Sequence, residues 1–96
     1  MYAVIFRAET NQLDQEYSDT AARLRSLAME KYGCLNFVAT TEGDQEIAIS
    51  YWETLEQISC WKQEAEHIKA QQRGRSKWYR TYQIQIVEVL REYNSA

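Results

Sequence analysis

The sequence contains a single histidine, two cysteines, three glycines and no proline, and this shortage limits the chemistry available to it. Cys34 and Cys60 do not form a CxxC spacing, and His67 has no second histidine with which to complete a zinc site. We therefore expect no metal ion. The formal net charge of −3 likewise offers no basic surface for nucleic acid, whose phosphates attract Lys and Arg.

Long apolar runs are also missing. No run approaches the ~18 residues that a membrane-spanning helix needs, and a strand-like run follows Met1 directly, without the basic segment of a signal peptide. We therefore expect a cytoplasmic protein with no membrane partner, whose two thiols stay reduced. Residues 1–96 are long enough for one hydrophobic core and are expected to form one domain.

The apolar spacing in the first third of the chain predicts a strand followed by a helix. Residues 2–8 are apolar on both sides of the pleat, which is typical of a strand covered on both faces. Asp14 is a suitable N-cap, and apolar residues then recur at steps of three and four up to Ala28. Gly33 stands where a left-handed helix end belongs.

A hairpin is predicted next. Residues 34–41 and 45–53 carry strand-forming side chains on either side of Gly43-Asp44. This pair has glycine first, as a two-residue type II′ turn requires. The hairpin supplies the second and third strands.

A second helix and a long last strand complete the chain. Thr54 and Gln57 form a capping box, and apolar residues then follow one helical face until Gly74 ends the helix. Residues 76–93 include a run of alternating side chains and predict a final strand about three times the usual length of roughly five to six residues.

The resulting order is strand, helix, strand, strand, helix, strand. It predicts an α+β fold of the ferredoxin-like βαββαβ type, an antiparallel sheet with both helices on one face. The helices leave the other face open, although the first and third strands are apolar on both faces, and the overlong last strand needs a partner beyond four strands. We therefore expect a homodimer that pairs through the sheet faces and the last strand.

Several segments together resemble a known family, the antibiotic biosynthesis monooxygenase (ABM) family. They are Ser50–Glu53, the helix from Trp61 to His67, Gly74-Arg75 and Trp78-Tyr79, and the resemblance extends over nearly the whole chain. It implies a dimeric α/β barrel with a pocket in each subunit between helices and sheet. It also implies a cofactor-independent monooxygenase that acts on a small aromatic or quinol-type substrate. The alternatives are a haem-degrading monooxygenase and a non-catalytic dimer that binds a small ligand.

The chain departs from the haem-degrading members of this family. Like this chain, which resembles them at Trp61, those members have a tryptophan in the helix. However, they carry an asparagine in the first strand, where this chain has Phe6 and Arg7. Their haem-ligating histidine follows the tryptophan by about ten residues, which falls near Gln71, whereas His67 comes one helical turn earlier. The resemblance therefore favours chemistry without haem.

Two helix residues are candidates for catalysis. Trp61 lies on the apolar face, where it either packs in the core or forms a pocket wall against a flat substrate. His67 is either a surface residue paired with Glu64 or the base that removes a phenolic proton before oxygen attack. Such a base matters because a phenolate or enolate passes an electron to oxygen more readily than the neutral form does.

Six further residues are candidates for substrate binding because they are polar or aromatic: Asn36, Tyr51, Trp52, Gln57, Trp78 and Tyr82. The resemblance to some polyketide-oxidising family members aligns Gln57 with an asparagine that those members carry one turn before the tryptophan. Because strand side chains alternate, Tyr51 and Trp52 face opposite sides of the sheet, and the sequence leaves open which side lines the pocket.

The segment from Lys69 to Arg80 carries five basic residues and no acidic one. Its cations either complement the negative C-terminal end of a helix or attract an acidic or phenolate substrate to the mouth of the pocket.

Overall fold

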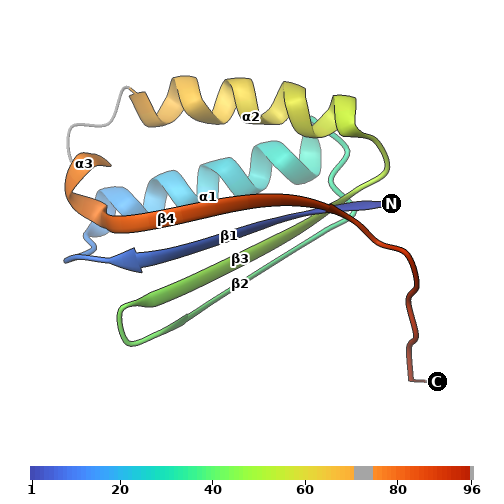
Figure 1. Ribbon diagram of the computed structural model, residues 1–96. Coiled ribbons are helices and arrows are strands. Elements are labelled where there is room, and N and C mark those ends of the chain that lie inside the picture. Colours follow the sequence, from blue (N-terminus) through green and yellow to red (C-terminus); the bar gives the residue numbers. More distant parts are fainter. Residues whose placement is uncertain (71–74, 96) are drawn as a thin grey trace.

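The computed structural model describes residues 1–70 and 75–95. The elements follow the predicted order, with one additional short helix: β1 (Tyr2–Thr10), α1 (Gln15–Glu30), β2 (Asn36–Glu42), β3 (Gln45–Trp52), α2 (Leu55–Ala70), α3 (Arg75–Trp78) and β4 (Tyr79–Glu88). The strands form one antiparallel sheet in the order β2-β3-β1-β4, and α1 and α2 cover the same face of it (Figure 1). The predicted ferredoxin-like βαββαβ fold is confirmed.

The register of the sheet decides which side chains face the helices. Phe6 on β1 is paired with Ala48 on β3 and with Ile84 on β4, and all three line the space under the helices. We call this side the inner face. Because side chains alternate along a strand, the neighbouring pair Ile5 and Ile49 points to the opposite side, which we call the outer face.

The core forms where the start of α2 lies on the inner face. Trp52 is fully buried there, and its indole Nε1 donates to the Ser50 hydroxyl at 2.9 Å. Its ring lies 5.4 Å from that of Trp61 and contacts a cluster that includes Ala28 and Ile58. Trp52 therefore joins both helices to the sheet.

The local signals in the sequence have their expected geometry. Asp14 caps α1 by accepting a hydrogen bond from a first-turn backbone N–H at 2.8 Å. Thr54 and Gln57 cap α2 reciprocally, each side chain accepting from the other residue's backbone N–H, at 3.1 and 3.3 Å. Gly33 and Gly43 have φ values of +81° and +60°, which favour glycine at the end of α1 and in the hairpin.

The prediction of a last strand over residues 76–93 is wrong in its length. Residues up to Trp78 form the short helix α3, and β4 spans only Tyr79–Glu88. Trp78 is buried, with its ring 5.2 Å from that of Tyr17 on α1. This burial favours a helical turn where sequence alternation alone predicted strand. The predicted helix end at Gly74 lies outside the described residues.

The outer face of the sheet has no helix over it (Figure 1). Val38, Ile47 and Val87 are exposed on this side. Beyond β4 the chain leaves the sheet and projects away from the helices (Figure 1), with Leu90 and Tyr93 more than 80% exposed. Apolar surface of this kind marks an interaction site when it is contiguous.

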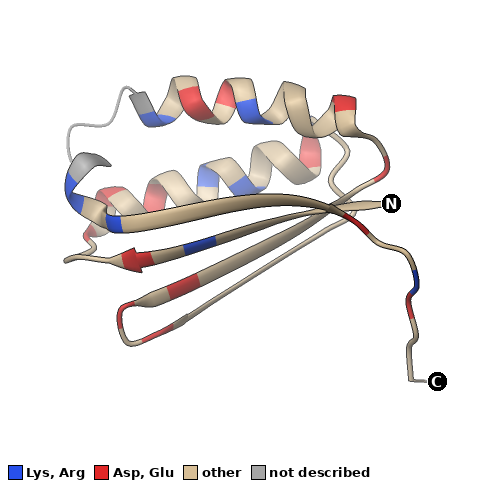
Figure 2. Cartoon of the chain, in the orientation of Figure 1, with Lys and Arg blue, Asp and Glu red and all other residues tan. Residues whose placement is uncertain are grey.

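Charged residues lie mainly on the helices and turns, and the strands carry few (Figure 2). In the part of the chain that the structure describes, no helix combines the length and the apolar character needed to cross a membrane.

Candidate functional site

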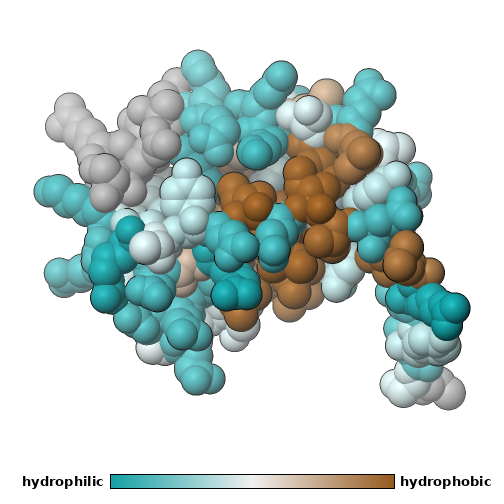
Figure 3. Space-filling view, in the orientation of Figure 1, coloured by the Kyte–Doolittle hydropathy of each residue, from teal (hydrophilic) through white to brown (hydrophobic). Residues whose placement is uncertain are grey.

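A cavity of about 200 Å³ lies between the helices and the inner face of the sheet. Its walls are mostly apolar and come from all four strands and both long helices; they include Val4, Phe6, Phe37, Ile58, Ile84 and Ile86. Ile86 is exposed, and Figure 3 shows hydrophobic side chains gathered between α2 and β4. The cavity is thus open to solvent along an apolar edge, at the place where a pocket was expected.

One buried carboxyl group stands at the end of this cavity. Glu46 lies on the inner face of β3 and is 9% exposed. The hydroxyl of Tyr17 on α1 donates a hydrogen bond to Glu46 Oε2. The Asp14 cap fixes the backbone of Tyr17, so the helix start and the strand together set this contact. A carboxylate has about four acceptor sites, so Glu46 can also accept a hydrogen bond from a ligand.

The two tyrosines at this end resist ionisation. The pKa of Tyr17 is raised by burial and, next, by its hydrogen bond to Glu46. Burial also raises the pKa of Tyr79 to about 12. Both phenols therefore stay protonated near neutral pH, so neither of them can act as a base there. The side chain of Glu46 supplies the carboxyl oxygens at this end.

The predicted pocket residue Trp78 lies beside this group. It is 3% exposed, lines the cavity and packs edge-on against Tyr17. Its Nε1 is buried and has no hydrogen-bond partner among the described residues. A buried donor without a partner is unusual in folded proteins.

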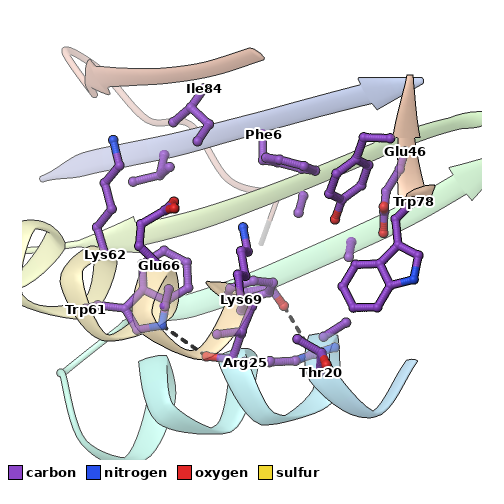
Figure 4. Close-up of a pocket in the computed structure, with 18 of the residues that line it drawn as sticks. Phe6, Thr20, Arg25, Glu46, Trp61, Lys62, Glu66, Lys69, Trp78 and Ile84 are labelled. Atoms are coloured by element: carbon purple, nitrogen blue, oxygen red, sulfur yellow. Dashed lines mark hydrogen bonds between the residues drawn. The ribbon is translucent and has the colours of Figure 1, made fainter. Parts of the chain in front are cut away.

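Trp61 both packs in the core and forms a wall of the cavity, the two roles that the sequence left open. It is partly buried, and its Nε1 donates to the Leu24 carbonyl of α1 at 3.1 Å (Figure 4). Its ring packs against Trp52 and Phe37 and also lines the cavity. It is therefore a wall whose orientation is fixed by a bond to the neighbouring helix.

The structure does not bring His67 to the cavity. The lining residues of α2 include Trp61, Ala65 and Lys69, which recur at the helical period on one face. His67 lies more than half a turn from Ala65, is exposed and is not a lining residue. Its position does not fit the role of a base at a substrate held in this cavity.

The other predicted binding residues lie elsewhere. Trp52 is in the core, and Gln57 is used in capping α2. Asn36 is exposed and accepts a hydrogen bond from the Phe37 backbone N–H. Tyr51 points to the outer face, and Tyr82 is 62% exposed beside a neighbouring hollow.

Tyr17 and Glu46 were not predicted as site residues. Glu46 shares its face of β3 with Ala48, Ser50 and Trp52. A charged residue on a strand face that is otherwise uncharged was the available signal. Among residues 1–70 and 75–95 no group of three metal-ligating side chains lies close enough to hold an ion.

Comparison with known proteins agrees with this architecture. The chain is 37% identical over 92 residues to the uncharacterised protein YqjZ of Bacillus subtilis (strain 168), and the match covers 95% of this chain and 81% of YqjZ. The chain belongs to the YqjZ family. No protein-family model matches the sequence.

Solved structures of low sequence identity share the fold of this YqjZ-family chain. A mutant of SnoaB, a cofactor-independent oxygenase from Streptomyces nogalater, has 10% identity and a TM-score of 0.78, with 98% and 97% of the two chains covered. A mutant of MhuD has 15% identity and a TM-score of 0.68, with 99% and 100% covered. MhuD of Mycobacterium tuberculosis is a haem degrader. The ABM-like fold that the sequence resemblance predicted is confirmed.

Removing the Tyr17 hydroxyl tests whether the buried pair is a real interaction. Tyr17→Phe leaves the carboxyl of Glu46 buried without this donor, which is expected to lower the free energy of unfolding by about 1–3 kcal/mol. Adding Glu46→Leu to Tyr17→Phe should recover part of that loss, because neither polar partner then remains. Urea unfolding of the parent, both single variants and the double variant measures the coupling. Tyr93→Phe in the exposed tail is the matched control. Strictly additive losses would contradict the interaction.

Proposed function

We propose that this chain is a cofactor-independent monooxygenase that acts on a small aromatic or quinol-type substrate in the cavity between helices and sheet. The observation that carries the proposal is an apolar, aromatic-lined cavity with one buried carboxyl group, Glu46, at its end. A largely apolar pocket with a few convergent polar groups is typical of a small-molecule site. The fold shared with SnoaB, described as a cofactor-independent oxygenase, supports the reaction class.

The walls suit a flat ring system. Trp61 and Phe37 form an aromatic corner, with ring centres 6.3 Å apart, and Phe6 lies across the cavity on β1. Stacking of a substrate ring on such a wall contributes about 0.5–1.5 kcal/mol beyond the burial of area. Trp61 is assigned this wall role.

Glu46 is assigned the proton transfer that the sequence gave to His67. A substrate hydroxyl bound at this end donates to the carboxylate and loses its proton to it. The resulting phenolate or enolate passes one electron to dioxygen, and the radical pair recombines to form a carbon–oxygen bond at a carbon that carries hydrogen. The peroxide anion takes the proton back from Glu46, and loss of water together with the hydrogen of that carbon leaves a carbonyl group. One oxygen atom enters the substrate and the other leaves as water, and the substrate supplies all four electrons and both hydrogens of that water.

The haem-degrading alternative fits this cavity less well. The cavity volume of about 200 Å³ is below the roughly 300–1,000 Å³ typical of pockets for drug-sized ligands. The single histidine of the chain, His67, is exposed on another side of α2. The corresponding ligand position, Gln71, lies outside the described residues. Haemin addition and a search for a Soret band test this alternative directly.

Oxygen uptake with a quinol or anthrone-like substrate tests the proposed reaction. Glu46→Gln keeps an acceptor for Tyr17 but cannot take a proton, so turnover should fall roughly 10²–10⁴-fold. His67→Ala should retain turnover, because His67 does not line the cavity. Glu42→Gln, an exposed carboxyl on β2, is the matched control.

The reverse result in these two variants would change the assignment of the base. Loss of turnover in His67→Ala with full turnover in Glu46→Gln would return the base to His67. A parent chain that binds these substrates without consuming oxygen would be the non-catalytic ligand-binding protein instead.

We further propose that two chains pair through their outer faces to form a dimeric α/β barrel. Val38, Ile49 and Ile5 are consecutive neighbours across three strands of that face, and an apolar sheet face of this kind is stabilised when a second sheet covers it. The exposed tail with Leu90 and Tyr93 can then reach the partner.

Sedimentation at micromolar concentration should give about twice the chain mass of 11.4 kDa. Ile47→Glu places a charge on the outer face and should shift the equilibrium toward monomer. Met29→Glu introduces the same charge in place of an apolar side chain at an exposed position of α1 and should leave the mass unchanged. A parent chain that sediments as a stable monomer would refute the pairing.

A further inference from the structure

Three tyrosines form a row from the Glu46 end of the cavity to the surface. The centre of the Tyr17 ring lies 6.0 Å from that of Tyr79, and the centre of the Tyr79 ring lies 6.0 Å from that of Tyr82. Tyr17 is buried, Tyr79 is half-buried and Tyr82 is 62% exposed. Tyr17 and Tyr79 line the cavity, whereas Tyr82 does not. The row therefore connects the inside of the cavity to solvent through ring contacts.

The phenol at the buried end of this row has a base beside it. The Tyr17 hydroxyl donates its hydrogen bond to Glu46 Oε2. Burial and then this bond raise the pKa of Tyr17, so the phenol carries its proton when an oxidant meets it. A phenol that loses one electron becomes a strong acid and releases its proton at once. A carboxylate within hydrogen-bond reach can take that proton, so Tyr17 can lose an electron and a proton together.

Two indole rings that line the cavity lack such a base. Trp61 donates to the Leu24 carbonyl, and a backbone carbonyl oxygen is far too weak a base to keep a proton. Trp78 has its ring 5.2 Å from that of Tyr17, but its Nε1 proton has no acceptor among the described residues. Oxidation of either indole would therefore leave a positive charge in largely apolar surroundings, which is costly. Tyr17 is the ring of these three from which an electron is most easily removed.

We propose that Tyr17 is a redox-active residue that gives one electron to an oxidising radical in the cavity, and that Tyr82 and Tyr79 resupply it from the surface. This role goes beyond the proposed function, which uses Tyr17 only to hold Glu46. The proposed reaction supplies an oxidant of the right class, a substrate phenoxyl radical, whenever its radical pair separates before the carbon–oxygen bond forms. The row would then restore the substrate.

The electrons and protons of this step balance. The phenoxyl radical receives one electron from Tyr17 and one proton from the carboxyl group of Glu46, and it becomes the phenol again. Glu46 receives the proton of Tyr17 in its place, and Tyr17 becomes a tyrosyl radical. Each transfer along the row then moves one electron and one proton inward, from Tyr82 to Tyr79 and from Tyr79 to Tyr17. A surface reductant such as ascorbate or a thiol supplies the last electron and proton to Tyr82.

The test uses menadione, a flat quinone, as the oxidant. Irradiated menadione takes one electron and one proton from a phenol, which gives a semiquinone and a tyrosyl radical. Samples irradiated without oxygen and then frozen should show a tyrosyl signal by electron paramagnetic resonance. Tyr17→Phe should remove most of that signal. Glu46→Gln should do the same, because the amide keeps an acceptor for the Tyr17 hydroxyl but cannot take its proton. Tyr93→Phe, in the exposed tail, is the matched control and should leave the signal unchanged.

Tyr82→Phe tests the route to the surface. Ascorbate is a polar anion that an apolar cavity excludes, so it should reduce the radical of the parent chain through the exposed Tyr82. In Tyr82→Phe the signal should form as in the parent and then persist severalfold longer after ascorbate is added. Melting curves of all the variants check that each is folded during the measurement.

Each remaining outcome overturns a defined part of the inference. A full signal in Tyr17→Phe, no tyrosyl signal in the parent, or a tryptophanyl signal in its place overturns the redox role of Tyr17. A full signal in Glu46→Gln overturns the carboxylate as the proton acceptor. Equal decay in the parent and Tyr82→Phe overturns the route to the surface. None of these measurements requires oxygen or turnover, so they are read independently of the oxygen-uptake test of the proposed function.

Discussion

The alternation of side chains across four paired strands is the constraint on which the site depends. It directs Phe6, Ala48 and Ile84 toward the helices together with Glu46, and it directs Ile5 and Ile49 away from them. The inner face thereby receives the cavity and its carboxyl group, whereas the outer face receives apolar residues that no helix covers. A shift of one residue in the register of β3 would exchange these two sets.

The buried carboxyl group of Glu46 affects both the stability of the fold and the chemistry proposed for the cavity. A carboxyl group on an apolar face must be hydrogen-bonded to be tolerated, and Tyr17 provides that bond from the start of α1. The same bond connects α1 to the sheet at the end of the cavity, so a group that would serve chemistry also helps to position a helix. Burial keeps the neighbouring Tyr79 protonated, and proton transfer by the carboxylate is the role proposed for Glu46.

Much of the fold was predictable because its signals are local. Asp14, the Thr54–Gln57 box and the Gly43 turn each depend on residues within a few positions of one another. The site was less predictable because its contacts join distant segments. Trp61 was identified from the apolar stripe, but the pairing of Tyr17 with Glu46 depends on how α1 lies over β3. The sequence left open whether His67 is a surface residue or a pocket base, and its exposed position away from the lining residues Trp61 and Ala65 follows from its angle around the helix. The last strand was overextended because alternation does not reveal that Trp78 is buried against α1.

The central claim is that an aromatic substrate lies between α2 and the inner face of the sheet with its hydroxyl on Glu46. A crystal structure of the chain with a quinol or anthrone-like substrate tests it most directly. The account predicts the rings against Trp61 and Phe37 and the hydroxyl within about 2.5–3.0 Å of a Glu46 carboxylate oxygen. A ligand bound at His67, or on the outer face of the sheet with the cavity unchanged, would contradict the account.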